Sequence, residues 1–211
     1  MQSQTKGEKE SNNDINNYNP DNKIIPTRIG DITYLNSENA KKVDDLLMGE
    51  NYKYSIDQLM EIAGLSVAKC IDNFLQENKN EKEKKRNKIL VICGPGSKLK
   101  LFNIKIKIQL NDYYLLDNGG DGVVASRYLK EFDYDVEILY PKKTGNELYL
   151  RLLKQCENYE ITIFNDFKDV DLLKYDLIID GIFGFSFSGD VREPFKNIIN
   201  VRKIFIILLK K

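Results

Sequence analysis

Strand-like and helical segments alternate along the second half of the chain, which predicts an α/β fold with a mostly parallel sheet. Apolar runs of strand length cover residues 88–93, 136–140, 161–164 and 175–182, and helical patterns cover 122–131 and 147–156. This order places helices on both faces of the sheet. Ligands of such sheets bind beyond the carboxyl ends of the strands.

Two further helices are predicted before the first of these strands. Ser37 can cap a helix that ends at Gly49. Ser55 and Gln58 fit a capping box that opens a second helix, whose apolar stripe runs through residues 59–75. Both helices need the sheet as a packing partner.

Composition limits the classes of function. A chain of 211 residues that is 42% hydrophobic can form one domain with a substantial core. Its 32 basic residues equal its 32 acidic residues, so no overall field favours nucleic acid or an anionic membrane. No apolar run reaches the length of about 18 residues that a membrane-spanning helix needs. We therefore expect no nucleic-acid partner and no membrane span.

The chain contains no histidine. This excludes a Ser-His-Asp or Cys-His nucleophile pair and histidine-based zinc sites, so acid–base chemistry falls to Asp, Glu, Lys, Tyr or water. A hard cation held by oxygen ligands is still compatible with the composition. Cys70, Cys93 and Cys156 each lie in an apolar pattern, which favours reduced core residues in a cytosol-like compartment.

Residues 1–28 are polar and rich in Asn, Lys, Glu and Gln. Because they lack the apolar residues that offset the entropy of ordering, we predict a disordered tail. Acidic residues in this tail, and the lack of arginine before Arg28, argue against a mitochondrial transit peptide. The cytoplasm is the expected location, with the mitochondrion as the alternative.

Two polar loops predict a site for a phosphate-bearing ligand. Asn118-Gly119-Gly120-Asp121-Gly122 precedes a helix, where N–H groups and the helix dipole attract anions. Residues 184–190 follow the strand that carries Asp180. Both loops fall at the carboxyl ends of predicted strands, so we expect Asn118 and Asp180 to converge on one crevice.

Structural roles compete with this interpretation. The glycines of the first loop can form a tight strand-to-helix turn, and Asp121 can cap the helix. Asp180 is harder to explain structurally, because an unpaired buried carboxylate is costly. Phe183, Phe185 and Phe187 alternate, which favours packing or loop anchoring over substrate contact.

A series of motifs occurs in a characteristic order: Tyr34-Leu35 with Asp44, Tyr54 to Ser66, Cys93 to Gly96, Asn118 to Gly122, Tyr140-Pro141-Lys142 and Asp180 to Phe187. In order and content they resemble the NAD(P)HX epimerase family, which has the YjeF N-terminal fold. The resemblance spans Tyr34 to Asn200 apart from one interruption. It implies a Rossmann-like three-layer α/β/α sandwich over residues 29–211.

The resemblance also implies an activity. It indicates an isomerase that interconverts the R and S epimers of hydrated NADH and NADPH (NADHX and NADPHX) during nicotinamide cofactor repair. The implied substrate-binding residues are Asn118, Gly119, Gly120, Asp121, Gly184, Phe185, Ser186, Phe187, Ser188, Gly189 and Asp190. One potassium ion per subunit, held in part by Asn118 and Asp180, and a homodimer are implied as well.

The chain departs from the family pattern at two places. The family reads Gly-Pro-Gly-Asn-Asn-Gly-Gly-Asp-Gly without a break, whereas residues 97–117 replace one Asn here. After Asn200 the family continues through a strand with an Ile-Asp-Ile-Pro-Ser-Gly type motif, whose Asp serves catalysis and whose Ser helps hold potassium. Residues 201–211 stand there instead, so we expect the C-terminal strands to be missing and leave the catalytic residue unassigned.

We interpret both departures as translated introns. Ser97-Lys98 can be encoded AGT-AAG, which contains the splice-donor string GTAAG, and Asp117 encoded GAT can supply an acceptor AG followed by AT. Joining the left-over A to AT restores an asparagine codon. Val201-Arg202 can likewise be the donor-like GTA-AGA. Weak or no epimerase activity is expected for the chain as written.

Two other classes of protein fit parts of the pattern. A non-catalytic binding or scaffold protein of the same fold, such as the related domain in the enhancer of mRNA decapping, would be expected to lose both polar loops, which are intact here. A nicotinamide-dependent dehydrogenase would have Gly-x-Gly-x-x-Gly at the start of the helix. Gly94-Pro95-Gly96 followed by Ser97 lacks the last glycine.

Overall fold

The computed structural model describes residues 27–29, 32–34, 37–77, 87–95, 105–107, 113–115, 119–183 and 189–201. In chain order the elements are β1 (Thr27–Ile29), β2 (Ile32–Tyr34), α1 (Ser37–Met48), α2 (Ile56–Glu77), β3 (Lys88–Cys93), β4 (Lys105–Lys107), β5 (Tyr113–Leu115), α3 (Gly119–Glu131), β6 (Asp135–Leu139), α4 (Glu147–Asn158), β7 (Thr162–Phe164) and β8 (Leu177–Gly181). Two short 3-10 helices, Phe167–Asp169 and Leu172–Lys174, precede β8, and residues 195–201 are helical.

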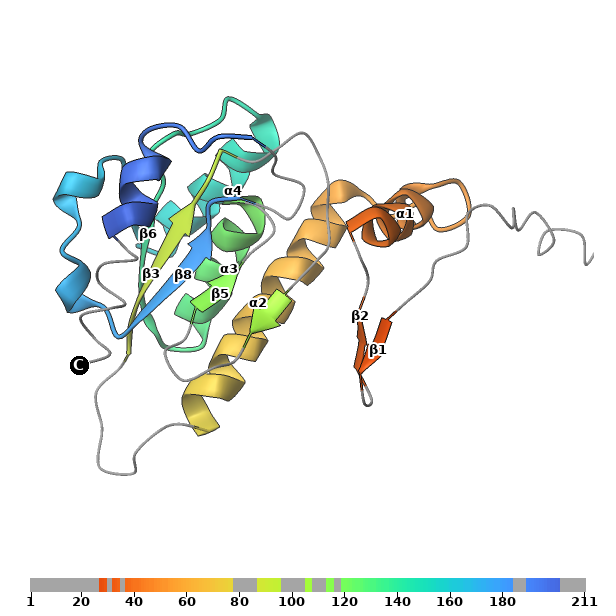
Figure 1. The fold of residues 1–211 in the computed structure, drawn as a ribbon, viewed down its shortest axis with the longest axis horizontal. Helices are drawn as coiled ribbons and strands as arrows, with labels where there is room; N and C mark the ends of the chain where they lie inside the picture. The colour runs from red at the N-terminus through yellow and green to blue at the C-terminus, as the bar shows by residue number, and fades with distance from the viewer. Residues whose placement is uncertain are drawn as a thin grey trace, which may run out of the picture.

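The described residues form one six-stranded sheet in the order β4-β5-β8-β3-β6-β7 (Figure 1). Strands β5, β8, β3, β6 and β7 are parallel, and β4 is antiparallel to β5. A separate hairpin pairs β1 with β2. The mostly parallel sheet confirms the predicted α/β class.

Strand β3 is buried on both of its faces. Ile89 and Val91 pack into a core that also contains side chains from α2, α3 and α4. Leu90 and Ile92 point the other way, into a second core that includes Phe195 from the helical segment after β8. Helices therefore cover both faces of the sheet, as in the Rossmann-like three-layer sandwich that the resemblance implies (Figure 1).

Local signals place the two helices that precede the sheet. Helix α1 runs from Ser37 to Met48, so its end agrees with the predicted stop at Gly49, whereas Ser37 is the first helical residue and not the predicted cap. At α2, Gln58 N–H donates to Ser55 Oγ at 3.1 Å, and Ser55 N–H donates to Gln58 Oε1 at 2.8 Å. These reciprocal hydrogen bonds confirm the capping box. None of the described helices is both long and apolar enough to cross a bilayer.

Three differences from the predictions go beyond shifts of one or two residues at the end of a predicted element. Strand β1 begins at Thr27, inside the segment 1–28 predicted as a disordered tail, because pairing with β2 supplies hydrogen bonds that composition does not reveal. Helix α3 begins at Gly119 rather than near Gly122. The interruption at 97–117, interpreted above as a translated intron although its apolar–polar alternation at 104–108 resembles a strand, contributes β4 and β5. Residues 1–26 and 202–211 lie outside the described part of the chain.

Helices α2 and α3 cross at a glycine. A Cβ placed on Gly64 would lie 2.4 Å from both Cβ and Cγ1 of Val124, which is itself buried. Val124 is β-branched and fixed between the helices, so it has little freedom to move aside. The absence of a side chain at Gly64 therefore sets how closely the two helices approach.

Gly64→Ala is expected to lower the free energy of unfolding by about 1–2 kcal/mol, although alanine gains about 1 kcal/mol in helix propensity. Urea titration followed by circular dichroism measures the change. Gly145→Ala is the matched control, because a Cβ placed on Gly145 meets nothing within 4 Å. A Gly64→Ala protein as stable as wild type would contradict the close crossing.

Candidate functional site

The candidate site lies at the carboxyl edge of the central strands. Strands β3 and β8 pair in parallel, with Ile92 opposite Asp180 and Cys93 opposite Gly181. Gly94 N–H then donates to Gly181 O at 2.9 Å, which continues the pairing past the end of β3. The end of β3 and the carboxylate of Asp180 are therefore neighbours at one edge of the sheet.

Main-chain contacts bring the start of α3 to this edge as well. A Cβ placed on Gly94 would lie 1.7 Å from Ile182 O, and one placed on Gly119 would lie 2.0 Å from Gly94 O. No side chain fits in either gap, so only glycine allows these three stretches of backbone to meet. We call residues 119–122, at the start of α3, the glycine turn. The glycine turn and the end of β8 both contact Gly94 and so converge, as predicted from the two polar loops. Asn118 itself lies outside the described residues.

Asp121 belongs to the first turn of α3 rather than to its cap. The helix begins at Gly119, and Gly119, Gly120 and Asp121 are all buried, with Asp121 only 3% exposed. The competing interpretation of Asp121 as the N-cap residue is therefore wrong, because the helical turn already includes it. A carboxylate in a first helical turn is stabilised by the positive end of the helix dipole.

Asp180 is a buried carboxylate at the end of β8. Its side chain is 5% exposed, and its Oδ1 accepts a hydrogen bond from Ile182 N–H at 3.1 Å. Its oxygens face the same edge of the sheet as the glycine turn.

The donor chemistry of this edge fits a hard cation such as potassium. A carboxylate from Asp180 and main-chain carbonyl oxygens near Gly94 and Ile182 are the oxygen ligands that such ions prefer. Within the described part of the chain no three acidic or thiol side chains gather into a metal cluster. A cation here would therefore depend on amide and carbonyl oxygens, of the kind that Asn118 carries.

Comparison with known proteins is informative at this point. The family described as YjeF-related protein N-terminus matches residues 56–204. The chain belongs to this family.

Several proteins named NAD(P)H-hydrate epimerase are similar to this YjeF-related chain. The one from Dictyostelium discoideum is 42% identical over 170 residues, covering 80% of this chain and 61% of that protein. The one from Plasmodium vivax is 39% identical over 170 residues, covering 81% of this chain and 50% of that protein. The one from Entamoeba histolytica is 42% identical over 177 residues, covering 82% of this chain and 66% of that protein. The chain thus spans about half to two thirds of the length of these relatives.

A solved structure supports the fold of the YjeF-related domain. The crystal structure of the yeast protein ynu0 (YNL200c) is 35% identical in sequence and superposes with a TM-score of 0.59. The match covers 78% of this chain and 62% of the yeast chain. The Rossmann-like architecture is therefore shared with an experimentally determined relative.

The second polar loop of the YjeF-related domain is described only in part. Gly184, Phe185, Ser186, Phe187 and Ser188 lie outside the described residues, while Gly189 and Asp190 are exposed. Gly189 has a φ of 100°, a backbone conformation that favours glycine. The structure therefore places the end of this loop at the surface.

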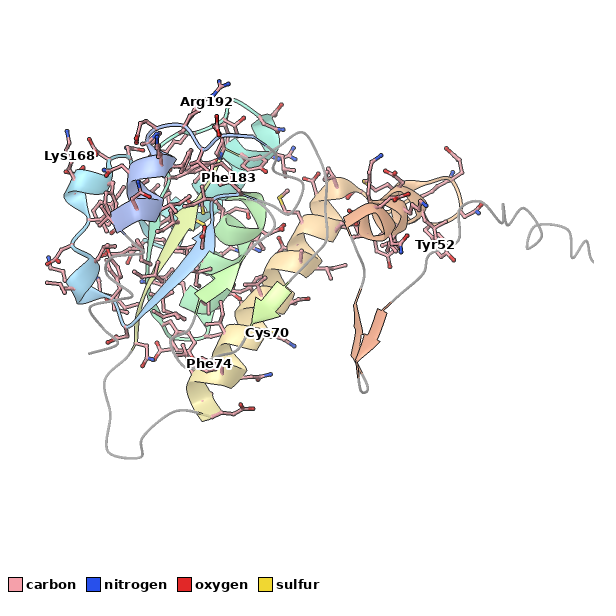
Figure 2. The ribbon with its side chains drawn as sticks, in the orientation of Figure 1. Tyr52, Cys70, Phe74, Lys168, Phe183 and Arg192 are labelled. Carbon is pink, nitrogen blue, oxygen red and sulfur yellow. The ribbon has the colours of Figure 1, made fainter. Side chains whose placement is uncertain are left out.

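Phe183, just before the loop, has a packing role. Its ring lies against that of Phe195, with centroids 5.5 Å apart and planes at 67°. This edge-to-face contact supports the packing interpretation for Phe183. Figure 2 shows Phe183 within the fold and Arg192, beyond the loop, at its periphery.

Three side chains that keep their protons at neutral pH, Cys93, Tyr140 and Tyr149, lie in the core that packs against α3. Burial first, and then the nearby Cys156 and Asp121, raise the pKa of the Cys93 thiol well above its usual value. Burial likewise raises the pKa of Tyr140, and that of Tyr149 to about 12. At neutral pH these groups hold their protons, so none of them is a general base.

The sequence assigned no role to Tyr149, which makes a hydrogen bond with the main chain of the glycine turn. Its hydroxyl oxygen accepts a hydrogen bond from Gly120 N–H. Tyr149 belongs to a helix that begins 28 residues after Gly119, since α4 starts at Glu147. No local pattern reports a contact of this kind, and only the packing of α4 against α3 reveals it.

Burial of thiols and phenols predicts a loss of stability at alkaline pH. Burial raises the pKa of Cys156 to about 12, and its Sγ–H donates to Val123 O at 3.3 Å. Because the folded-state pKa exceeds the ordinary value of 9.0, the folded protein holds the proton more tightly than the unfolded chain. The resulting stabilisation is present below pH 9 and is lost as pH rises toward 12.

The free energy of unfolding should therefore fall between about pH 9 and 12, by up to about 1.4 kcal/mol per pH unit for each such group. Urea titrations in reducing buffer across this range measure the slope. Cys156→Ala should reduce the slope, whereas Cys70→Ala, at a half-buried thiol, should reduce it less. Identical slopes for wild type and Cys156→Ala would contradict the prediction.

Proposed function

We propose that this YjeF-related domain interconverts the R and S epimers of hydrated NADH and NADPH, as a step in nicotinamide cofactor repair. The observation that carries the proposal is the convergence of the glycine turn of α3 with the buried carboxylate of Asp180. It occurs in a chain about 40% identical to proteins named NAD(P)H-hydrate epimerase. A homodimer and a cytoplasmic location remain predictions.

The glycine turn suits the diphosphate of a nicotinamide cofactor. The first N–H groups of α3 lack partners within the helix, and the dipole adds positive potential where a phosphate would bind. The Cβ position of Gly119 is taken up by Gly94 O, so glycine here allows the turn to pack, and the phosphate is proposed to bind through main-chain N–H groups of the turn. The exposed end of the second loop, Gly189-Asp190, lies beyond the same strand edge and can contact the remainder of the substrate.

The chemistry requires erasing and remaking one stereocentre. The hydrated carbon carries a hydroxyl next to a ring nitrogen, so reversible loss of that hydroxyl, or ring opening, removes the configuration. Either route transfers a proton, which a positioned carboxylate can accept and return. Cys93 and Tyr149 stay protonated at neutral pH, so this role falls to a carboxylate at the site.

Potassium would be held at the same edge by Asp180 together with Asn118. When bound, the ion would add positive charge beside the phosphates and fix the end of β8 relative to the glycine turn. Asp180 contributes a buried carboxylate whose Oδ1 is already oriented by Ile182 N–H. This orientation limits the reorganisation that ion binding would require.

Epimerase activity is tested on hydrated NADPH of mixed configuration, coupled to a stereospecific dehydratase. The 211-residue chain is expected to show weak or no activity, because in the sequence residues 97–117 directly precede the loop proposed to bind substrate. The form translated from a message lacking both intron-like segments is expected to show measurable activity. Equal activity in the two forms would refute this expectation, and sequencing the transcript across both junctions checks the intron interpretation itself.

Potassium binding is tested by thermal denaturation in potassium chloride and in choline chloride at equal ionic strength. Potassium should raise the wild-type Tm, by about 2–4 °C for each kcal/mol of binding free energy. Asp180→Asn should abolish the difference, because the amide lacks the negative charge. Asp45→Asn, at an exposed carboxylate of α1, should retain it. A potassium effect that survives Asp180→Asn would place the ion elsewhere.

A further inference from the structure

We propose that Tyr149 of α4 is a positioning residue that holds the glycine turn of α3 in its ligand-binding conformation. The role rests on the proposed function, since it concerns the same turn. Tyr149 is the one residue of α4 to which we give a role at the site.

The contact is built by the start of α4. Asn146 caps this helix, with its side chain accepting a hydrogen bond from Leu148 N–H at 2.9 Å. Tyr149 follows in the first helical turn and is 6% exposed, within the core that also contains Cys93 and Val123. Its hydroxyl reaches the buried main chain of Gly120 and accepts the N–H of that residue.

This hydrogen bond decides which backbone donors remain for a ligand. The first N–H groups of a helix have no carbonyl partner in the helix itself. Tyr149 accepts the N–H of Gly120, so a bound phosphate has to use the neighbouring donors of the turn. The turn is then fixed from two sides, by the Gly94 carbonyl against Gly119 and by Tyr149 against Gly120.

The surroundings keep Tyr149 suited to this task. Burial, followed by the nearby charge of Asp121, raises the pKa of Tyr149 to about 12. The phenol therefore stays neutral throughout the physiological range, and the hydrogen bond does not switch with pH. Asp121, 3% exposed, follows Gly120 directly, so a shift of the turn would also move its carboxylate.

The test compares Tyr149→Phe with Tyr134→Phe in the 211-residue chain. The two tyrosines are matched, since each is 6% exposed and each hydroxyl makes a hydrogen bond, that of Tyr134 donating to Asp72 Oδ1 at 2.7 Å. Tyr134 directly precedes β6, so it lies at the amino ends of the parallel strands, away from the carboxyl ends where the site lies. Both substitutions remove one hydroxyl and keep the ring, so general destabilisation should be similar.

Two measurements are made on each protein. Hydrogen exchange of the Gly120 amide should accelerate about two- to tenfold in Tyr149→Phe and stay at the wild-type rate in Tyr134→Phe. The dissociation constant for hydrated NADPH, from calorimetric titration, should rise by about the same factor in Tyr149→Phe alone.

The two measurements separate the two hypotheses. Unchanged exchange at Gly120 in Tyr149→Phe, or equal acceleration in Tyr134→Phe, would overturn the positioning role. Accelerated exchange at Gly120 in Tyr149→Phe alone supports that role, whether or not hydrated NADPH binds. If neither the 211-residue chain nor the form without the two intron-like segments binds hydrated NADPH, the proposed substrate fails, while the exchange result still decides the role of Tyr149.

Discussion

The site depends on one steric constraint, the contact of three main-chain segments at Gly94. The backbone after β3 touches Ile182 beyond β8 on one side and Gly119 at the start of α3 on the other. A methyl group at Gly94 would overlap the carbonyl oxygen of Ile182, so the strand ends would have to separate. Everything that the site offers to a ligand, the helix start and the carboxylate of Asp180, is held in place by this contact.

The same contact explains how the chain accommodates residues 97–117. Gly94 and Gly119 touch, so the segments on either side of the interruption lie close together. Closing such a loop costs little extra entropy as it lengthens, because the cost grows only logarithmically. A connection shortened to a single asparagine is also geometrically compatible, since it has almost no distance to span. Family pattern and structure therefore agree that the turn is complete without the interruption.

Local chemistry made most of the fold predictable. The capping box at Ser55 and the stop at Gly49 act within a few residues, so sequence alone located α1 and the start of α2. Buried parallel strands read as continuous apolar runs, and β3 was found for that reason. Family motifs then identified the glycine turn and Asp180 as parts of one site.

The contacts that the sequence did not predict join residues far apart in the chain. Tyr149 reaches Gly120 only because α4 packs on α3, and no spacing rule reports such a contact. Strand β5 escaped for a similar reason. Its three residues have no strand pattern of their own beyond Tyr113-Tyr114, and they become a strand by pairing with Ile178–Asp180 of β8. Tyrosine favours strands, but three residues are too few to predict one, and the open edge of β8 supplies the hydrogen bonds that define it.

Strand β5 occupies the edge that the handedness of the crossovers would give to a strand following residues 195–201. The chain passes from β3 through α3 to β6, and the cores place α3 on one face of the sheet. The helical segment 195–201 follows β8 and packs on the opposite face of the sheet. A right-handed crossover from β8 through this segment would therefore place the next parallel strand on the side of β8 that is away from β3. That edge is where β5 lies, with Leu115 opposite Asp180. Strand β5, which belongs to the interruption, therefore occupies the side of β8 that a parallel strand after residues 195–201 would take. It lies directly beside Asp180, the carboxylate at the centre of the proposed site.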